Sequence, residues 1–237
     1  MSALRILIAD DHEVTRRGIR VLLENHPGWE VCGEAVDGRE AVGCAAQLKP
    51  DLVLLDIAMP NLNGIEATRQ ILSASPRIRV LILTMHDAEE IVREVLVAGA
   101  LGFLLKSDAG RDLVAAVEAL QQGRTFFTGR IGQLVIDGYL HASPVCDERS
   151  RQALTPRERE VIQLLAEGKT TKEVAIILDL SVKTAETHRM NVMRKLNAHS
   201  VVDLTHYAVR NGIVHVSRIF PLRPNTLKES TFTGSQP

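Results

Sequence analysis

The stretch that decides the fold reads Asp51-Leu-Val-Leu-Leu-Asp56-Ile-Ala-Met-Pro60. An uninterrupted apolar run leads into the carboxylate of Asp56, and the turn-forming residues Pro60, Asn61, Asn63 and Gly64 follow. A short apolar run between turn residues is typical of a strand buried on both faces of a parallel sheet. The C-terminal end of such a strand is where open α/β sheets bind their ligands. From this stretch alone, Asp56 could equally be a cap of the turn.

Length and composition narrow the class of protein. The chain has 237 residues, which suits two compact domains, and 45% of them are hydrophobic, which is enough for each domain to bury a core. No apolar run approaches the roughly 20 residues of a membrane span, and the N-terminus has no signal-peptide pattern. The three cysteines are odd in number and lack metal-ligand spacing, as expected of reduced thiols. We therefore expect a cytoplasmic protein with no membrane part.

The charge is distributed unevenly along the chain. Residues 1–122 carry 12 Lys and Arg against 18 Asp and Glu, a net charge of −6, whereas residues 154–213 carry 9 against 7, a net charge of +2. An acidic first half and a mildly basic second half indicate different partners, with nucleic acid a candidate for the second.

Apolar runs and helical patterns alternate through the first half. The expected strands are residues 4–9, 29–36, 52–55, 80–84 and 101–106, and the expected helices are residues 14–22, 41–48, 65–72, 91–98 and 113–120. This order predicts a doubly wound α/β domain with a five-stranded parallel sheet.

Polar residues recur where these strands end: Asp10 and Asp11, Asp56, Thr84, and Lys106. In a parallel sheet these strand ends lie along one edge. Three carboxylates brought together repel one another unless a cation joins them, and oxygen ligands suit Mg²⁺. Asp56 could then attack a phosphoryl donor as a carboxylate nucleophile, while a metal ion and Lys106 offset the charge on the transferred group.

With this set of residues, the first half resembles a flavodoxin-like receiver domain of bacterial two-component systems. The resemblance implies that Asp56 is the phosphoacceptor. It also implies that Asp11 and Asp56 bind Mg²⁺ directly, that Asp10 supports the ion through water, and that the Ala58 backbone carbonyl is a further ligand.

The same resemblance assigns roles beside the acidic residues. Thr84 and Lys106 would contact the phosphoryl group, and Phe103 occupies the family's aromatic switch position, although it could also be ordinary core. Ser107 stands where many receivers have Pro, which leaves open whether the Lys106–Ser107 bond is cis.

Residues 123–153 lose regular periodicity and are expected to form a linker, with a short helix near residues 131–136. From Leu154 onward, cap residues open successive helices. Thr155, Pro156 and Glu158 make a capping box with Pro at the first helical position, Thr170 begins a second box, and Ser181 can cap a third helix. Two short helices joined by a tight turn in an all-α unit of four helices predict a helix-turn-helix domain over residues 154–216.

The third of these helices, ending near Leu196, has an apolar side and a polar side. Polar side chains on the outer side could read base edges and meet phosphates, or could simply be a solvated face. Residues 154–214 resemble the LuxR-type helix-turn-helix of NarL/FixJ response regulators, in the motifs Leu-Thr-Pro-Arg-Glu-Arg-Glu and Leu-Ser-Val-Lys-Thr-Ala-Glu-Thr-His-Arg. The expected DNA-binding residues are Lys183, Thr184, Glu186, Thr187, Arg189, Met190, Asn191 and Arg194.

The resemblances imply a response regulator that a sensor histidine kinase phosphorylates on Asp56 and that then binds double-stranded DNA, as a homodimer, to regulate transcription. RNA polymerase is a further candidate partner. No enzymatic turnover is expected beyond the protein's own phosphotransfer and dephosphorylation. Two alternatives stay open: a phosphatase, although Ala58 replaces the acid-base Asp of such enzymes, and a regulator that acts without phosphorylation. Residues 217–237 carry no readable motif and are expected to be disordered.

Overall fold

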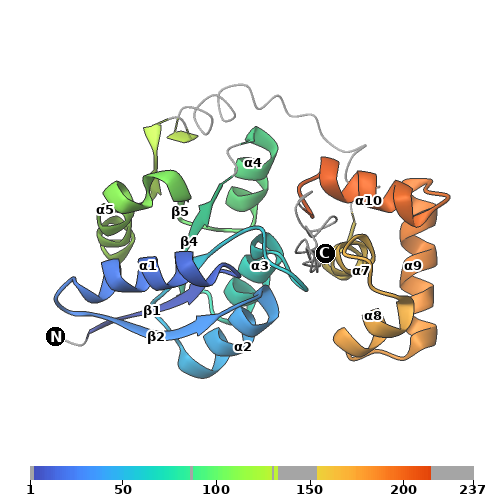
Figure 1. The fold of residues 1–237 in the computed structure, drawn as a ribbon, viewed down its shortest axis with the longest axis horizontal. Helices are drawn as coiled ribbons and strands as arrows, with labels where there is room; N and C mark the ends of the chain where they lie inside the picture. The colour runs from blue at the N-terminus through green and yellow to red at the C-terminus, as the bar shows by residue number, and fades with distance from the viewer. Residues whose placement is uncertain (1–2, 86–87, 130, 133–153, 215–237) are drawn as a thin grey trace, which may run out of the picture.

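The computed structural model describes residues 3–85, 88–129, 131–132 and 154–214. These residues form two parts, which lie side by side in Figure 1. The sheet part contains the strands and helices α1 to α5, and the helical part contains helices α7 to α10. Residues 131–132, at the start of the expected linker helix, are helical, whereas the rest of that helix and the expected disordered tail lie outside the described residues. Among the described helices, none has the length and apolar character needed to cross a membrane.

The sheet part is built on parallel strands in the order β2-β1-β3-β4-β5-β6. The strands are β1 (Leu4–Ala9), β2 (Trp29–Ala35), β3 (Leu52–Leu55), β4 (Arg79–Thr84), β5 (Gly102–Leu105) and β6 (Phe126–Phe127).

All five predicted strands are present, and β6 adds a sixth strand among the described residues. Phe126 and Phe127 pair with Gly102 and Phe103 of β5. A strand of two residues is too short to show an alternating pattern, so β6 could not be predicted from the sequence. Its pairing covers the edge of β5 that would otherwise be open.

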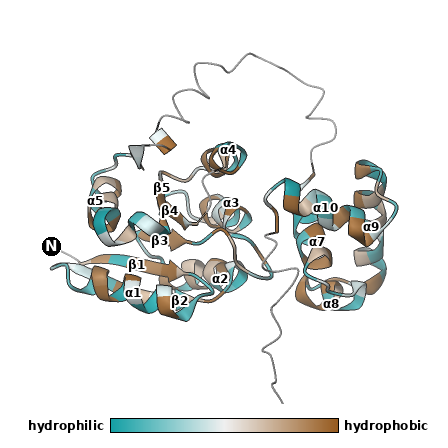
Figure 2. Ribbon diagram, turned by 45° about the horizontal axis from the view of Figure 1, so that its top comes forward, coloured by the Kyte–Doolittle hydropathy of each residue, from teal (hydrophilic) through white to brown (hydrophobic). Residues whose placement is uncertain are grey.

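Helices cover both faces of the sheet. Helices α1 (Glu13–Glu24) and α5 (Ala109–Gln121) pack on one face, and α2 (Gly38–Leu48), α3 (Gly64–Ala74) and α4 (Glu89–Val97) pack on the other. The sequence of β3 is uniformly apolar because both of its faces are buried. Leu52 and Leu54 enter the core under α1 and α5, whereas Val53 and Leu55 enter the core under α2 to α4. Figure 2 shows this hydrophobic interior on the central strands.

The helical part contains α7 (Pro156–Ala166), α8 (Thr171–Ile177), α9 (Val182–Leu196) and α10 (Val201–Arg210) around one apolar core. The predicted capping boxes at Thr155 and Thr170 are confirmed, and Ser181 caps α9 by accepting a hydrogen bond from the Thr184 N–H. A turn with Asp179 at φ +51° joins α8 to α9. The short α8, this turn and the longer α9 form the predicted helix-turn-helix.

Candidate functional site

Three carboxylates meet at the edge of the sheet where the parallel strands end. Asp10 and Asp11 follow β1, and Asp56 follows β3. The Asp56 N–H donates to the Ala9 carbonyl over 2.8 Å, which aligns the ends of these two strands. Oxygen atoms of the three carboxylates and a ring nitrogen of His12 all lie within 4.8 Å of one another. The structure therefore brings together the acidic residues that the sequence placed on separate strands.

Lys106 lies between two of these carboxylates. It begins a single 3-10 turn, η1 (Lys106–Asp108), directly after β5. Its Nζ is 2.7 Å from Asp10 Oδ2 and 2.9 Å from Asp56 Oδ2, and both Asp side chains are only 2% exposed. No peptide bond in the described ranges is cis, so the Lys106–Ser107 bond is trans.

The cluster carries more negative than positive charge. Burial raises the pKa of the Asp56 carboxyl, Lys106 lowers it, and the neighbouring Asp10 raises it again, so that the pKa lies above its ordinary value. One ammonium facing three carboxylates leaves a negative charge that a cation would offset. The donor set consists of carboxylate oxygens, which are hard ligands and fit Mg²⁺. This chemistry makes Asp10, Asp11 and Asp56 a candidate metal site.

His12 is a member of the cluster that the sequence did not assign to the site. It stands at the N-cap position of α1, but its side chain makes no capping hydrogen bond. Its Nδ1 instead lies 2.9 Å from Asp11 and 3.4 Å from Asp10, and its side chain is 65% exposed. The only sequence feature that could have placed His12 in this cluster is that it directly follows Asp10 and Asp11.

Thr84 and Phe103 lie on the strands beside the acidic cluster. Thr84 is fully buried at the C-terminal end of β4 and pairs in register with Leu105, the residue before Lys106. Phe103 is also fully buried, in the core under α2 to α4. In this conformation Phe103 is packed as a core residue, and its switch role stays a prediction.

The loop of residues 57–63 connects Asp56 to α3 and is called the β3–α3 loop below. It is folded tightly on the acidic cluster: the Ala58 backbone hydrogen-bonds to the Asp56 carboxylate, and the Gly64 N–H donates to the Ile57 carbonyl over 3.0 Å. A Cβ atom at Gly64 would lie 2.1 Å from the Asp56 carbonyl oxygen. Only glycine therefore allows α3 to start this close to the phosphoacceptor candidate.

The predicted DNA-binding residues lie together on α9. Lys183, Glu186, Thr187, Met190 and Arg194 are exposed, and the predicted core residues of the same helix, Ala185 and Val192, are fully buried. Thr184 is also exposed, and Arg189 and Asn191 are half-buried.

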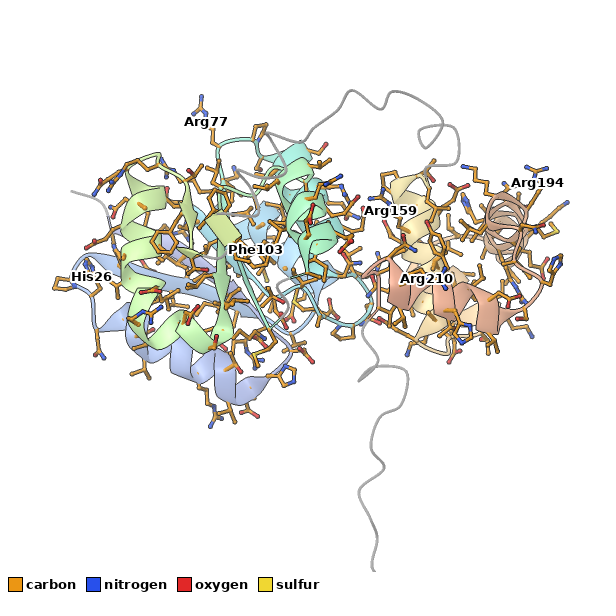
Figure 3. The ribbon with its side chains drawn as sticks, turned by 90° about the horizontal axis from the view of Figure 1, so that it is seen from above. His26, Arg77, Phe103, Arg159, Arg194 and Arg210 are labelled. Carbon is orange, nitrogen blue, oxygen red and sulfur yellow. The ribbon has the colours of Figure 1, made fainter. Side chains whose placement is uncertain are left out.

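Helix α9 lies on the side of the helical part that is remote from the sheet, and Arg194 points outward there (Figures 1 and 3). Arg189 donates to the Thr171 hydroxyl over 3.3 Å, which holds its side chain against the start of α8. Within the described ranges, the outer face of α9 is thus free for a partner, and the individual DNA contacts stay a prediction.

Two family models match the chain. Residues 6–118 match the response regulator receiver domain, and residues 152–208 match the bacterial regulatory proteins of the luxR family. The transcriptional regulatory protein LiaR of Bacillus subtilis is 36% identical over 212 residues, which cover 90% of this chain and all of that protein. The response regulator UvrY of Escherichia coli is 33% identical over 216 residues, which cover 91% of this chain and 98% of that protein.

Solved structures of response regulators are similar to most of this chain. A structure of the RcsB response regulator of Salmonella typhimurium has a TM-score of 0.59 at 29% identity, over 89% of this chain and 99% of that one. A structure of an RcsB–DNA complex has a TM-score of 0.54 at 29% identity, with the same coverage.

Proposed function

The chain belongs to the response regulators that join a receiver domain to a LuxR-type DNA-binding domain, and we propose that Asp56 is the residue through which a sensor histidine kinase controls its binding to DNA. The protein is a transcription regulator of the two-component type. The observation that carries the proposal is the position of Asp56, which is buried, in reach of Lys106 and at the meeting point of the carboxylates.

In the proposed phosphotransfer, a carboxylate oxygen of Asp56 attacks the phosphorus of a phosphohistidine. The new O–P bond forms as the P–N bond breaks, and the kinase histidine leaves with the electron pair. Lys106 can hold a phosphoryl oxygen, and the Thr84 hydroxyl can hydrogen-bond another after transfer. Asp11, Asp56 and the Ala58 carbonyl would hold Mg²⁺ directly, and Asp10 would support it through water; the ion would supply further positive charge to the transferred group.

The proposed output is DNA binding through α9. Helix α9 would enter the major groove, with base contacts from Glu186, Thr187 and Met190, and with phosphate contacts from cations at its edges. We propose that two copies pair through α10, where Val201 and Val202 are exposed, to bind two half-sites. RNA polymerase is a further candidate partner at a promoter.

The proposed domain boundaries follow from these roles. Residues 1–122 form the receiver domain and residues 123–153 form the linker, whose first part contributes β6 to the edge of the receiver sheet. Residues 154–216 form the DNA-binding domain, and residues 217–237 form a tail. Catalysis is limited to the protein's own phosphotransfer and dephosphorylation, because Ala58 offers no acid-base group for the turnover of phosphate esters.

Labelling with radioactive acetyl phosphate in the presence of Mg²⁺ tests the assignment of the phosphoacceptor. We expect the wild-type protein to take up one label and Asp56→Asn to take up none. Asp51→Asn is the matched control, because Asp51 is an exposed carboxylate at the other end of β3 and its amide replacement can still accept the Arg5 N–H. Undiminished labelling of the Asp56 variant would sink the assignment.

A further inference from the structure

Helix α7 is buried on two sides, although one of them is polar. Its apolar residues Val161, Ile162 and Leu164 face the core of the helical part. Glu160 and Gln163 are also buried, with 5% and 1% exposure. Burial of polar groups is unfavourable unless they are hydrogen-bonded, so their partners show what this side of α7 is built to contact.

The partners of Gln163 are backbone groups of the β3–α3 loop. Its side-chain oxygen accepts the Asn63 N–H over 2.9 Å, and its side-chain nitrogen donates to the Met59 carbonyl over 3.1 Å. The same nitrogen lies 2.8 Å from Glu167, whose other oxygen accepts the Asn61 N–H over 3.2 Å. Two side chains of the DNA-binding domain therefore hold three backbone groups of the loop that begins at the phosphoacceptor.

Ion pairs and a hydrogen bond from the preceding turn of α7 extend this contact. Glu160 accepts from Arg39 of α2 over 2.6 Å and from Gln70 of α3 over 2.9 Å. Arg159 lies 3.2 Å from Glu66 of α3 and 3.4 Å from Glu94 of α4.

Figure 3 shows Arg159 on the side of α7 that faces the receiver. A cavity of about 410 Å³, lined largely by charged residues, remains between α3 and α4 on one side and the start of α7 and the end of α10 on the other. The interface is thus polar and incompletely filled, as is typical of domain contacts that open reversibly.

We propose that Gln163 and Glu167 form a clamp on the β3–α3 loop that keeps the two domains docked until Asp56 is phosphorylated. This inference rests on the proposed function of Asp56. Ala58 lies in the clamped loop and contacts the Asp56 carboxylate. A phosphoryl group adds about −1.5 to −2 charges and three acceptor oxygens at this position. The loop must adjust to these oxygens, and the hydrogen bonds to the clamp then lose their geometry.

The docked state limits DNA binding without covering α9. The outer face of α9 is exposed while the domains are docked (Figure 1). Two α9 helices of a dimer, however, must lie about one turn of DNA apart, roughly 34 Å, in a defined relative orientation. A DNA-binding domain fixed to its own receiver has one orientation only, and release gives it the freedom to pair. Because coupling is reciprocal, weakening the clamp also favours phosphorylation.

Amide hydrogen exchange tests the clamp directly. In the unphosphorylated full-length protein, the Asn61 and Asn63 amides are expected to be protected. Gln163→Met keeps the length of the side chain but cannot hydrogen-bond, and we expect Asn63 to exchange at least about tenfold faster. Glu167→Ala is expected to release Asn61 more than Asn63. Gln121→Met, an exposed change on α5, is the matched control and should change neither amide. Protected amides within α7 show that each variant is folded.

A second experiment compares the protection of the same amides before and after phosphorylation. Wild-type protein treated with acetyl phosphate and Mg²⁺ should lose protection at both loop amides, and Asp56→Asn should keep it. Unchanged protection at Asn63 in Gln163→Met overturns the clamp. Retained protection in wild-type protein whose phosphorylation is verified by mass overturns the coupling and leaves the proposed function intact. If the mass shows no phosphorylation at all, the proposed function fails, while loss of protection in Gln163→Met still supports the clamp.

Discussion

Replacing Lys106 by Met removes the only ammonium group that the described structure shows between Asp10 and Asp56, 2.7 and 2.9 Å from their oxygens. Met fills a similar volume, so the change acts mainly through charge. Two carboxylates that are each 2% exposed then face one another without a cation. The folded receiver must hold both charges or protonate one of them, and either response costs free energy.

Removal of one partner from a buried ion pair typically costs about 3–5 kcal/mol. The Asp56 pKa is already raised, so one carboxyl can take up a proton and relieve part of this penalty. We therefore expect Lys106→Met to lower the free energy of unfolding by about 3 kcal/mol. Asp56→Asn alone leaves Asp10 and Lys106 as a balanced pair and should be neutral or stabilising. The double variant should recover at least about 1 kcal/mol of the loss, because the two groups interact directly.

Urea unfolding of the full-length protein, followed by tryptophan fluorescence, reports the stability of the receiver domain. Trp29 is the only tryptophan of the chain, and it lies in β2, where it stacks on His26. The assay needs Mg²⁺-free buffer, and adding Mg²⁺ should reduce the loss in Lys106→Met by returning a cation to the cluster. A loss below about 1 kcal/mol, or an equal loss with and without Asp56→Asn, refutes this account of the charge balance.

Three further outcomes follow from the contacts described above. Gly64→Ala should destabilise the receiver by roughly 1–3 kcal/mol in the same unfolding assay, because its Cβ would lie 2.1 Å from the Asp56 carbonyl oxygen. Arg194→Ala should weaken binding to all DNA sequences alike, because Arg194 is expected to contact a phosphate. Titrations at several salt concentrations should show that the slope of log affinity against log salt concentration falls in magnitude by about 1. A change in sequence preference would contradict this role. Burial alone would raise the Glu158 pKa, but Lys195 and the Thr155 donors outweigh it and hold the pKa below its ordinary value. The stability that Glu158 adds is therefore present above the unfolded pKa of about 4.3 and is lost as the pH falls through the lower folded pKa. Glu158→Gln should destabilise the DNA-binding domain at pH 7, and the difference from wild type should shrink as the pH is lowered below about 4.3. Unfolding followed by circular dichroism across this pH range measures the effect.

Much of the fold could be predicted because local patterns determine it. The apolar run of β3 is uniform because its residues enter two different cores. The helices of the DNA-binding domain start where Thr155, Thr170 and Ser181 can accept backbone hydrogen bonds, and these caps are readable within four residues. The acidic cluster was predictable for a related reason, since parallel strands place their C-terminal ends on one edge.

The interface between the domains could not be predicted in the same way. On α7 the polar residues Glu160, Gln163 and Glu167 have the spacing of a solvated helix face, and only the fold reveals that the receiver covers them. The same holds for β6, which pairs with β5 across more than twenty intervening residues and is too short to carry a pattern. Contacts between elements that are far apart in sequence leave no periodic signal, so the control of one domain by the other emerges only in three dimensions.

The measurement that tests the central claim most directly is selection of genomic DNA fragments by the purified protein, with and without acetyl phosphate and Mg²⁺. The account predicts that specific fragments are enriched by phosphorylated wild-type protein, and that the enrichment disappears without the donor or with Asp56→Asn. Equal enrichment of the same fragments by Asp56→Asn and by phosphorylated wild-type protein would contradict it.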